Sequence, residues 1–393
     1  MTLFEKENQY LMNTYATLPI EISYGQGSCL FDDNNKKYID FTSGIGVNSL
    51  GYNNEPWKKE VISQLNSFQH LSNIFTNNTT VDLAKKLCEL SGMSKVFFAN
   101  SGAEANECAI KLARKYSFNK YGNGRGTILS LKQSFHGRTL ATLTATGQDK
   151  FHNYFFPFPT GFNYVEANSI DDLKENITSD VCAIIMEAIQ GEGGVHPLNK
   201  DFVLESCKLA REKDILIIFD EVQCGIARTG MLFGYNNFNI QPDIVTSAKG
   251  LGAGLPIGAV LCNEKLSTTF VPGDHGSTFG GNPVICAGAI SVLNQLCNLD
   301  SYCDITFKGE FIKNTILNEN IKTVIDVRGF GLMIGIEING DSSTIQKKAL
   351  ENGLLVLTAG KNVIRLLPPL NITMEDVKAG VDILISILKD ENY

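Results

Sequence analysis

The sequence lacks three features that would each point to a class of protein: a basic block, a long apolar run and a secretion signal. Its 34 Lys and Arg are outnumbered by 42 Asp and Glu, giving a net charge of −8, so a nucleic acid or an anionic membrane is not a favoured partner. No apolar stretch approaches the ~18 residues of a membrane span. The N-terminal segment MTLFEKENQYLMNTY has no basic start followed by an apolar centre. We therefore expect a cytoplasmic protein that acts on small molecules.

Paired cysteines and nucleotide-binding glycine loops are also missing. None of the ten cysteines is spaced as C-x-x-C, and some, such as Cys182 and Cys262, lie in apolar runs, as reduced core thiols do. A disulfide framework or a zinc site is therefore not expected, nor is any other metal. Neither G-x-G-x-x-G nor a Walker A loop occurs, so a dinucleotide or a nucleoside triphosphate is not indicated. No Ser/His/Asp or Cys/His grouping has hydrolase spacing, although spacing alone leaves one open with five histidines.

Apolar runs and amphipathic stretches are what the middle of the chain does contain. With 43% hydrophobic and 19% charged residues, the chain can bury a large core. The alternation favours α/β units around a largely parallel sheet that is covered on both faces. We expect these buried strands: KVFFAN (95–100), GTILSL (126–131), CAIIMEA (182–188), ILIIFDE (215–221), DIVTSA (243–248) and GAVLCN (258–263). We also expect a helix over 200–214, with an apolar face of Phe202, Leu204, Cys207 and Leu209.

A second, smaller lobe is indicated where this pattern changes, after Gly281. The periodicity predicts a helix over 283–299, a strand pair near 324–338 and a closing helix from about Thr373. One face of the closing helix carries Val377, Val381, Leu384 and Leu388. The start of the chain reads as strands around an Asp/Asn turn and is expected to join this lobe. The predicted divisions are an N-terminal segment of the small domain (1–50), a large domain (51–285) and a C-terminal small domain (286–393).

One lysine stands out in DIVTSAKGLGAGLPIGAVL, because Lys249 is the only charged residue after Asp243 in a stretch of small and apolar residues. Two interpretations stay open on this segment alone. The stem of the side chain could pack while the ammonium reaches water. Alternatively, burial could keep the amine partly neutral and make it a nucleophile that forms a Schiff base.

Two other strand ends carry candidate binding groups. In FFANSGAEANECAIKLARK, Ser101 precedes a helix whose first turn offers free N–H groups to a phosphate, or is simply the N-cap of that helix. In IIFDEVQ, Asp220 and Glu221 end a strand, where open α/β sheets bind ligands. A carboxylate there is either hydrated or holds a proton on a cofactor ring nitrogen.

Further candidates lie in loops. Phe135 is either a core residue or a stacking partner for a flat ring, while Arg138 and Arg365 are either surface ion pairs or clamps for carboxylates. Glu187 and Glu192 flank a glycine-rich turn, and another loop carries Thr278.

Together these motifs resemble the class III, ω-amino-acid family of pyridoxal-phosphate aminotransferases, most closely its acetylornithine branch. The similarity covers almost the whole chain. The motifs occur in the family's order: NSGAEANE, FHGRT, QGEGG, DEVQCGIARTG, SAKGLGAGLPIGA, GSTFGGNP and RLLPPL. The resemblance implies the type I fold of these enzymes, with a large domain around a mostly parallel sheet and a smaller α+β domain from both termini.

The resemblance also assigns roles around the coenzyme. Lys249 would hold pyridoxal 5′-phosphate covalently and move the proton, and Asp220 would keep the pyridine nitrogen protonated. The implied coenzyme-binding residues are Ser101, Gly102, Ala103, Phe135, Asp220, Val222, Gln223, Lys249 and Thr278. Thr278 would reach the phosphate of the other subunit, which implies a homodimer with shared active sites.

The implied reaction moves the δ-amino group of N-acetylornithine to 2-oxoglutarate, a step of arginine biosynthesis. Arg138 would clamp the distal carboxylate and Arg365 the α-carboxylate of glutamate, while Glu192 pairs with Arg365 and moves away for glutamate. Other implied substrate contacts are Tyr15, Ile45 and Ser277. Ornithine aminotransferases tend to have a tyrosine where Ile45 stands, which favours an acylated substrate here. The alternatives are succinylornithine, N-succinyl-diaminopimelate, ornithine or 4-aminobutyrate as substrate, and a catalytically silent coenzyme-binding protein.

Overall fold

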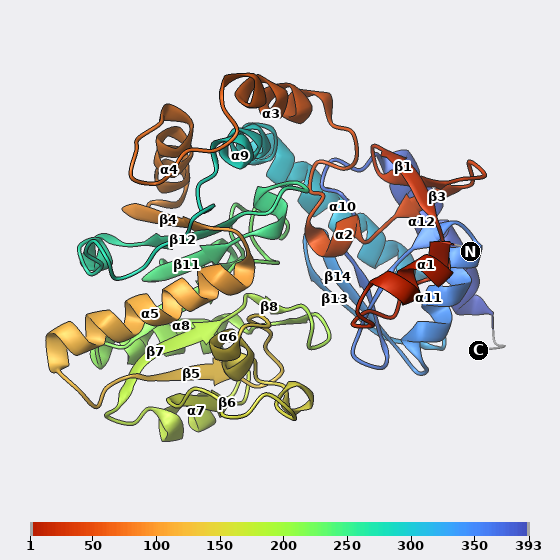
Figure 1. The fold of residues 1–393 in the computed structure, drawn as a ribbon. Helices are drawn as coiled ribbons and strands as arrows, with labels where there is room; N and C mark the ends of the chain where they lie inside the picture. The colour runs from red at the N-terminus through yellow and green to blue at the C-terminus, as the bar shows by residue number, and fades with distance from the viewer. Residues whose placement is uncertain (1–2, 391–393) are drawn as a thin grey trace.

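A seven-stranded mixed sheet forms the centre of the larger domain in the computed structural model, which describes residues 3–390 (Figure 1). Its strands are, in spatial order, β4 (Lys95–Ala99), β12 (Gly258–Cys262), β11 (Ile244–Ser247), β10 (Leu216–Asp220), β7 (Val181–Met186), β5 (Thr127–Leu131) and β6 (Phe162–Val165). Of these seven strands, β12 runs opposite to the other six. All the expected runs are strands. Strand β6 was not predicted, because it buries only one of its four residues and has no continuous apolar run.

Both faces of this sheet are covered, which explains the continuous apolar sequence of its central strand. Alternate residues of β10 point to opposite faces: Leu216 and Ile218 pack with α5 (Gly102–Tyr121), while Ile217 and Phe219 face the core that includes α8 (Lys200–Glu212). In Figure 1, α5 lies across the sheet in front of the strands.

The predicted apolar face of α8 was right for Phe202, Cys207 and Leu209, which pack in the core, and wrong for Leu204. Its buried residues are Phe202, Val203, Ser206 and Ala210, whereas Leu204 is exposed. Two residues apart along a helix means about 200° of rotation, so Phe202 and Leu204 cannot share a face.

The smaller domain contains two four-stranded sheets that combine both ends of the chain. One has the order β1 (Ile22–Gln26), β2 (Cys29–Asp32), β3 (Lys37–Asp40) and β15 (Leu354–Leu355). The other has the order β13 (Val324–Phe330), β14 (Met333–Ile338), β17 (Val363–Leu366) and β16 (Leu357–Ala359). Because β15 pairs in parallel with β3, the N-terminal segment joins the C-terminal part, as expected. The boundaries after residues 50 and 285 stay predictions.

Helices complete both domains, and their ends follow capping chemistry. The expected helix over 283–299 is confirmed as α9 (Pro283–Leu296), which ends three residues earlier than predicted. A second helix, α10 (Leu299–Asn318), was not predicted; it begins after Asn298, whose side chain accepts a hydrogen bond from the Ser301 N–H at 2.9 Å. The closing helix α12 (Met374–Lys389) does begin after Thr373, its N-cap. The remaining helices are α1 (Leu3–Tyr10), α2 (Ser43–Gly46), α3 (Glu55–Ser67), α4 (Asn78–Ser91), α6 (Leu140–Ala145), α7 (Ile170–Asn176) and α11 (Ser342–Glu351). Within residues 3–390, no helix is long and apolar enough to cross a membrane.

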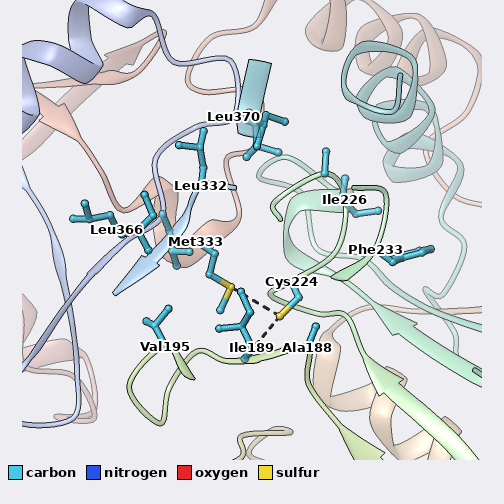
Figure 2. Close-up of a cluster of buried hydrophobic side chains, with 14 of the residues drawn as sticks. Ala188, Ile189, Val195, Cys224, Ile226, Phe233, Leu332, Met333, Leu366 and Leu370 are labelled. Carbon is cyan, nitrogen blue, oxygen red and sulfur yellow. Dashed lines mark hydrogen bonds between the residues drawn. The ribbon is translucent and has the colours of Figure 1, made fainter. Parts of the chain in front are cut away.

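A buried cluster joins the two domains beside a short hairpin, β8 (Ile189–Gln190) and β9 (His196–Pro197) (Figure 2). The cluster includes Ala188, Ile189, Val195, Cys224, Ile226, Phe233, Leu332, Met333, Leu366 and Leu370. The Cys224 thiol donates to the Ile189 carbonyl at 3.4 Å and lies 3.9 Å from the Met333 sulfur. The hairpin is therefore packed against side chains from both domains.

Phe41→Ala tests whether the N-terminal segment is part of the small-domain core. The Phe41 side chain is fully buried and contacts α12 at Gly380, where a Cβ would come within 2.3 Å of its ring. We expect the substitution to lower the free energy of unfolding by about 3–5 kcal/mol, measured by denaturant unfolding. Phe118→Ala on the exposed side of α5 is the control, with an expected loss of about 0.5 kcal/mol or less. Equal losses for the two variants would contradict the packing.

Candidate active site

A cavity of about 600 Å³ opens at the carboxyl edge of the large sheet. Its walls come from the segments that follow β4, β5, β7, β10 and β11, the place where open α/β sheets bind ligands. Most of the site residues expected from the sequence line it: Tyr15, Ser101, Gly102, Ala103, Phe135, Arg138, Glu192, Asp220, Val222, Gln223 and Lys249. The fold thus brings together residues that are up to 234 positions apart, from Tyr15 to Lys249.

Lys249 lies in the cavity wall directly after β11, in a strained backbone conformation. Its φ is 44°, in the left-handed region that side-chain-bearing residues rarely adopt. Such strain is found where the surroundings fix a functional residue. Burial lowers the pKa of Lys249, and nearby Glu192 partly opposes that effect. Its amine has no hydrogen-bond partner among residues 3–390, so the interpretation of a partly neutral nucleophile gains support over that of a solvated lysine.

Asp220 ends β10 as a buried carboxylate with a full set of donors. One oxygen accepts from the Asn106 side chain and from His136 Nδ1, each at 2.7 Å, and the other accepts from the Val222 N–H at 3.0 Å. Asn106 is itself oriented by the Thr246 hydroxyl, which donates to its carbonyl oxygen at 2.8 Å. The donors hold this carboxylate rigidly at the cavity wall.

The neighbouring Glu221 points away from the cavity and has a different task. Its carboxyl accepts hydrogen bonds from the N–H groups of Gly234 and Tyr235, at 2.7 and 2.9 Å. Burial raises the pKa of Glu221 to about 8, in spite of these two hydrogen bonds. Of the two adjacent carboxyls, only Asp220 lines the cavity.

The N-terminus of α5 borders the same cavity. Ser101 is the N-cap, since its hydroxyl oxygen accepts from the Glu104 N–H at 3.2 Å. The N–H groups of Gly102 and Ala103 donate to no residue that the structure describes, and both residues line the cavity. A Cβ on Gly102 would come within 2.6 Å of the Val222 side chain, so only glycine fits there. This cradle of free donors at the positive end of a 20-residue helix is suited to a phosphate.

Glu192 and Arg365 form an ion pair across the domains. Arg365 Nη1 donates to Glu192 at 2.5 Å and to the side-chain oxygen of Gln223 at 3.1 Å. Burial would raise the pKa of Glu192, but the Arg365 charge outweighs it and holds the pKa below its usual value. The Nε of Arg365 is buried without a partner within the described residues. Arg365 therefore keeps a free donor for a second carboxylate.

Arg138 lies over aromatic rings at the mouth of the cavity. Its guanidinium is 4.3 Å from the ring centroid of Phe151 and 5.5 Å from that of Phe135. Within residues 3–390, no carboxylate pairs with it. Cation–π contacts orient an arginine but leave its N–H groups free, so Arg138 is suited to bind an anion that enters the cavity.

Four expected site residues lie outside the cavity wall. Arg365 is one of them, and it contacts the wall residues Glu192 and Gln223. Ile45 is partly exposed with a φ of 64°, at the edge of the small domain. Ser277 contacts Asn100, a cavity residue, through a hydrogen bond of 3.1 Å. Thr278 is exposed on the same loop. Their roles stay predictions.

Two residues that hold the Asp220 carboxylate were not predicted from the sequence: His136 and Asn106. Both lie within motifs that were already singled out, so position within a motif was the available signal. Glu187 lines the cavity and accepts from the Phe135 N–H at 3.1 Å. Burial, followed by the charge of Asp220, raises its pKa well above the usual value.

These features fit pyridoxal phosphate on the chemistry of the donors alone. The coenzyme requires an amine that is not paired, a carboxylate for its ring nitrogen and donors for its phosphate. Lys249, Asp220 and the start of α5 supply these three groups around one cavity.

Comparison with known proteins gives the same class. The profile of the family described as Aminotransferase class-III matches residues 10–388. The acetylornithine aminotransferase of Haemophilus ducreyi is 48% identical over 384 residues, covering 97% of each chain. Among solved structures, the ornithine aminotransferase of Toxoplasma gondii ME49 has a TM-score of 0.95 at 30% identity, covering 98% of this chain and 94% of that one. The N-acetylornithine aminotransferase of Stenotrophomonas maltophilia K279a has a TM-score of 0.85 at 32% identity, covering 98% of both.

The fold and the chemistry of the cavity are those of a pyridoxal-phosphate-dependent transferase. More narrowly, the chain belongs to the class-III aminotransferases, and it uses pyridoxal phosphate as its coenzyme.

The pH dependence of stability tests whether Glu221, the neighbour of Asp220, is buried as the structure shows. Its pKa of about 8 in the folded protein exceeds the ordinary 4.5, so the folded state holds a proton that the unfolded state releases. The stability from this group is complete below pH ~4.5 and declines as pH rises to about 8. The difference in unfolding free energy between the parent and Glu221→Gln should therefore shift in favour of the variant between pH 5 and 8, measured by denaturant unfolding. Glu175→Gln on the exposed side of α7 controls for the lost charge. A constant difference for Glu221→Gln would contradict the assignment.

Proposed function

We propose that this class-III aminotransferase moves the terminal amino group of N-acetylornithine to 2-oxoglutarate, giving N-acetylglutamate 5-semialdehyde and glutamate. The observation that supports this proposal is the Glu192–Arg365 ion pair at 2.5 Å beside an unpaired Lys249. While the pair is intact, no free arginine lies next to the reacting amine. When the pair opens, Arg365 is free to bind a carboxylate there. The relatives named acetylornithine aminotransferase, at 41–48% identity, support the choice of substrate.

Lys249 and Asp220 carry the chemistry in this proposal. When bound, pyridoxal phosphate links to an amino group and accepts the electron pair released when the adjacent C–H bond breaks. Lys249 would hold the coenzyme, and its amine would take the proton from the substrate carbon as a base. Its lowered pKa suits that task. Asp220 is fixed by Asn106 and His136 and would hold the proton of the ring nitrogen.

Around them, other residues bind the rest of the coenzyme. Phe135 and Val222 would flank its ring, Gln223 would donate to it, and Ser101, Gly102 and Ala103 would bind its phosphate. Phe135 and Val222 both line the cavity, on segments that follow different strands.

The two substrates carry their carboxylates at different distances from the reacting amine, and a different arginine would bind each carboxylate. Arg138 would bind the carboxylate far from the reacting amine, which in N-acetylornithine is the α-carboxylate. Arg365 would bind the α-carboxylate of glutamate. With a terminal amine bound, Arg365 faces no substrate anion, and an unpaired buried charge is costly, so Glu192 pairs with it. For glutamate, Glu192 moves away and the N–H groups of Arg365 donate hydrogen bonds to the α-carboxylate of the substrate.

The acyl preference rests on Ile45, with Tyr15 and Ser277 as further substrate contacts. An apolar side chain offers nothing to a free α-ammonium group and so favours an acylated nitrogen. The higher TM-score belongs to an ornithine aminotransferase, but that score compares backbones, and both structures are about equally identical to this chain. Succinylornithine, N-succinyl-diaminopimelate, ornithine and 4-aminobutyrate are the competing substrates.

We further propose that the enzyme works as a cytoplasmic homodimer in which Thr278 reaches the phosphate of the partner's coenzyme. Thr278 lies on an exposed loop that Asn73 holds by donating to the carbonyls of Ser277 and Gly280. Ile74, Phe75 and Phe279 beside it are exposed apolar side chains. A contiguous apolar patch of this kind is typical of an interface.

The proposed substrate is tested by the absorption band of the bound coenzyme, titrated with each candidate amine and no oxo acid. We expect N-acetylornithine to bleach the band at a concentration at least ~10-fold lower than ornithine. Lys249→Ala should bind coenzyme but lose turnover by about 10²–10⁴-fold. If ornithine bleaches the band first, the use of Ile45 is wrong. If no amine bleaches it, the substrate proposal fails while the family assignment stands.

Glu192→Ala tests the exchange at Arg365. Without its partner, Arg365 is open to glutamate, so the ratio of kcat/KM for glutamate to that for N-acetylornithine should rise by about tenfold, as for loss of one charged hydrogen bond. Glu166→Ala, which removes a carboxylate paired with Lys132 on the surface, should leave the ratio unchanged. An unchanged ratio in Glu192→Ala would remove the exchange from the mechanism.

A further inference from the structure

Three residues of the small domain form a row across neighbouring strands. Arg328 on β13 lies opposite Gly335 on β14, which in turn lies opposite Arg365 on β17. Residues directly opposite in antiparallel strands share one face of the sheet. This face therefore presents two arginines with a gap between them, because glycine has no side chain. We call these residues the Arg–Gly–Arg row.

The tip of the β8–β9 hairpin, residues 191–195, is seated on this row. Arg365 binds the Glu192 carboxylate at one end. At the other end, Arg328 donates from Nε to the Val195 carbonyl at 3.0 Å and from Nη2 to the Gly194 carbonyl at 2.8 Å. Val195 fills the gap between them, since a Cβ on Gly335 would lie 2.7 Å from the Val195 Cβ.

The backbone of the tip is strained, so it needs this support. Val195 has a φ of 54°, a true outlier for a β-branched residue, and Gly194 has a φ of 120°. Strained residues persist where their surroundings over-determine them, and they cluster at functional sites. One of the two hydrogen bonds from Arg328 acts on the carbonyl of the strained Val195, and the other acts on the carbonyl of Gly194, whose conformation requires glycine.

Arg328 is held in place by carboxylates of its own. Its Nη1 donates to Asp326 at 2.8 Å and to Glu337 at 2.6 Å. These neighbours balance the charge of Arg328, so it does not compete with Arg365 for Glu192. His196 Nε2, at 3.4 Å, is the other titratable group that faces it. Arg328 therefore acts on the tip through backbone carbonyls and not through the charge of the Glu192 carboxylate.

We propose that Arg328 and Gly335 form a seat that fixes the hairpin tip and thereby sets how readily Glu192 leaves Arg365. Arg328 is a positioning residue, because it touches the tip and not the cavity. With the tip seated, Glu192 stays at Arg365 and substrates without a neighbouring carboxylate are favoured. With the seat weakened, Arg365 is free more often and glutamate gains. This inference rests on the proposed exchange between two substrates and adds the element that tunes it.

Arg328→Met tests the seat, with Arg114→Met as the matched control. Arg114 also donates to backbone carbonyls, those of Gly126, Thr160 and Gly161, but far from the cavity. We expect Arg328→Met to raise the glutamate preference about fivefold to tenfold, mainly by lowering the KM for glutamate, which is the size of effect for the net loss of one hydrogen bond. The control should lose stability with the preference unchanged.

Amide hydrogen exchange of residues 189–197 supplies a readout that needs neither coenzyme nor substrate. Exchange there should accelerate in Arg328→Met and stay as in the parent in Arg114→Met. Arg328→Lys keeps the charge but not the two-pronged donor, so it should behave as Arg328→Met does. In combination with Glu192→Ala, Arg328→Met should add no further change in preference, since both act on one pair.

Each outcome decides the matter. Unchanged exchange at the hairpin in Arg328→Met overturns the seat. Accelerated exchange with an unchanged substrate preference overturns its link to specificity. If the parent reacts with neither N-acetylornithine nor glutamate, the proposed function fails, while the exchange experiment still judges the seat. Should Arg328→Met not fold, Gly335→Ala displaces Val195 directly, and the same two outcomes apply.

Discussion

A buried carboxylate that must find donors organises the large domain. Asp220 ends the central strand of the sheet, where it is removed from water, and its charge is supported by Asn106 from α5, by His136 from the loop after β5 and by the backbone of Val222. Thr246 on the next strand orients Asn106 in turn. The helix, the loop and the neighbouring strand are therefore positioned around one charge. The same carboxylate faces the coenzyme site, so the requirement for folding and the requirement for chemistry are met by the same contacts.

The site also depends on the contact between the two domains, because not all of its residues come from the edge of the large sheet. Glu192 comes from the large domain and Arg365 from the small one, and the hairpin between them packs into the shared apolar cluster. Apolar packing brings the two charged residues together, and the ion pair then fixes their relative orientation. A movement of one domain against the other would change the distance between Glu192 and Arg365.

Much of this could be predicted from the sequence, and the failures have physical reasons. Strands buried on both faces, such as β7 and β10, can be recognised in the sequence as continuous apolar runs. The cavity residues lie in motifs at the ends of such strands. The short edge strand β6 carries no such run, and the break between α9 and α10 depends on one capping asparagine. The roles of His136 and Asn106 were hidden because each acts through Asp220, more than 80 residues away in sequence. Likewise, β-sheet register alone aligns Arg328 with Arg365, and register is not written in any local pattern.

The parallel pairing of β3 with β15 has a consequence for how the chain is made. Ile39 pairs with Leu354, more than 300 residues later, so the first sheet of the small domain stays incomplete until nearly the whole chain has left the ribosome. The large domain lies between these partners and can form first, since domains fold as units during synthesis. Until β15 has been made, the edge of β3 that pairs with it has no partner strand. Closing that edge is a late step that brings the two ends of the polypeptide together, and contacts of such high sequence separation form slowly.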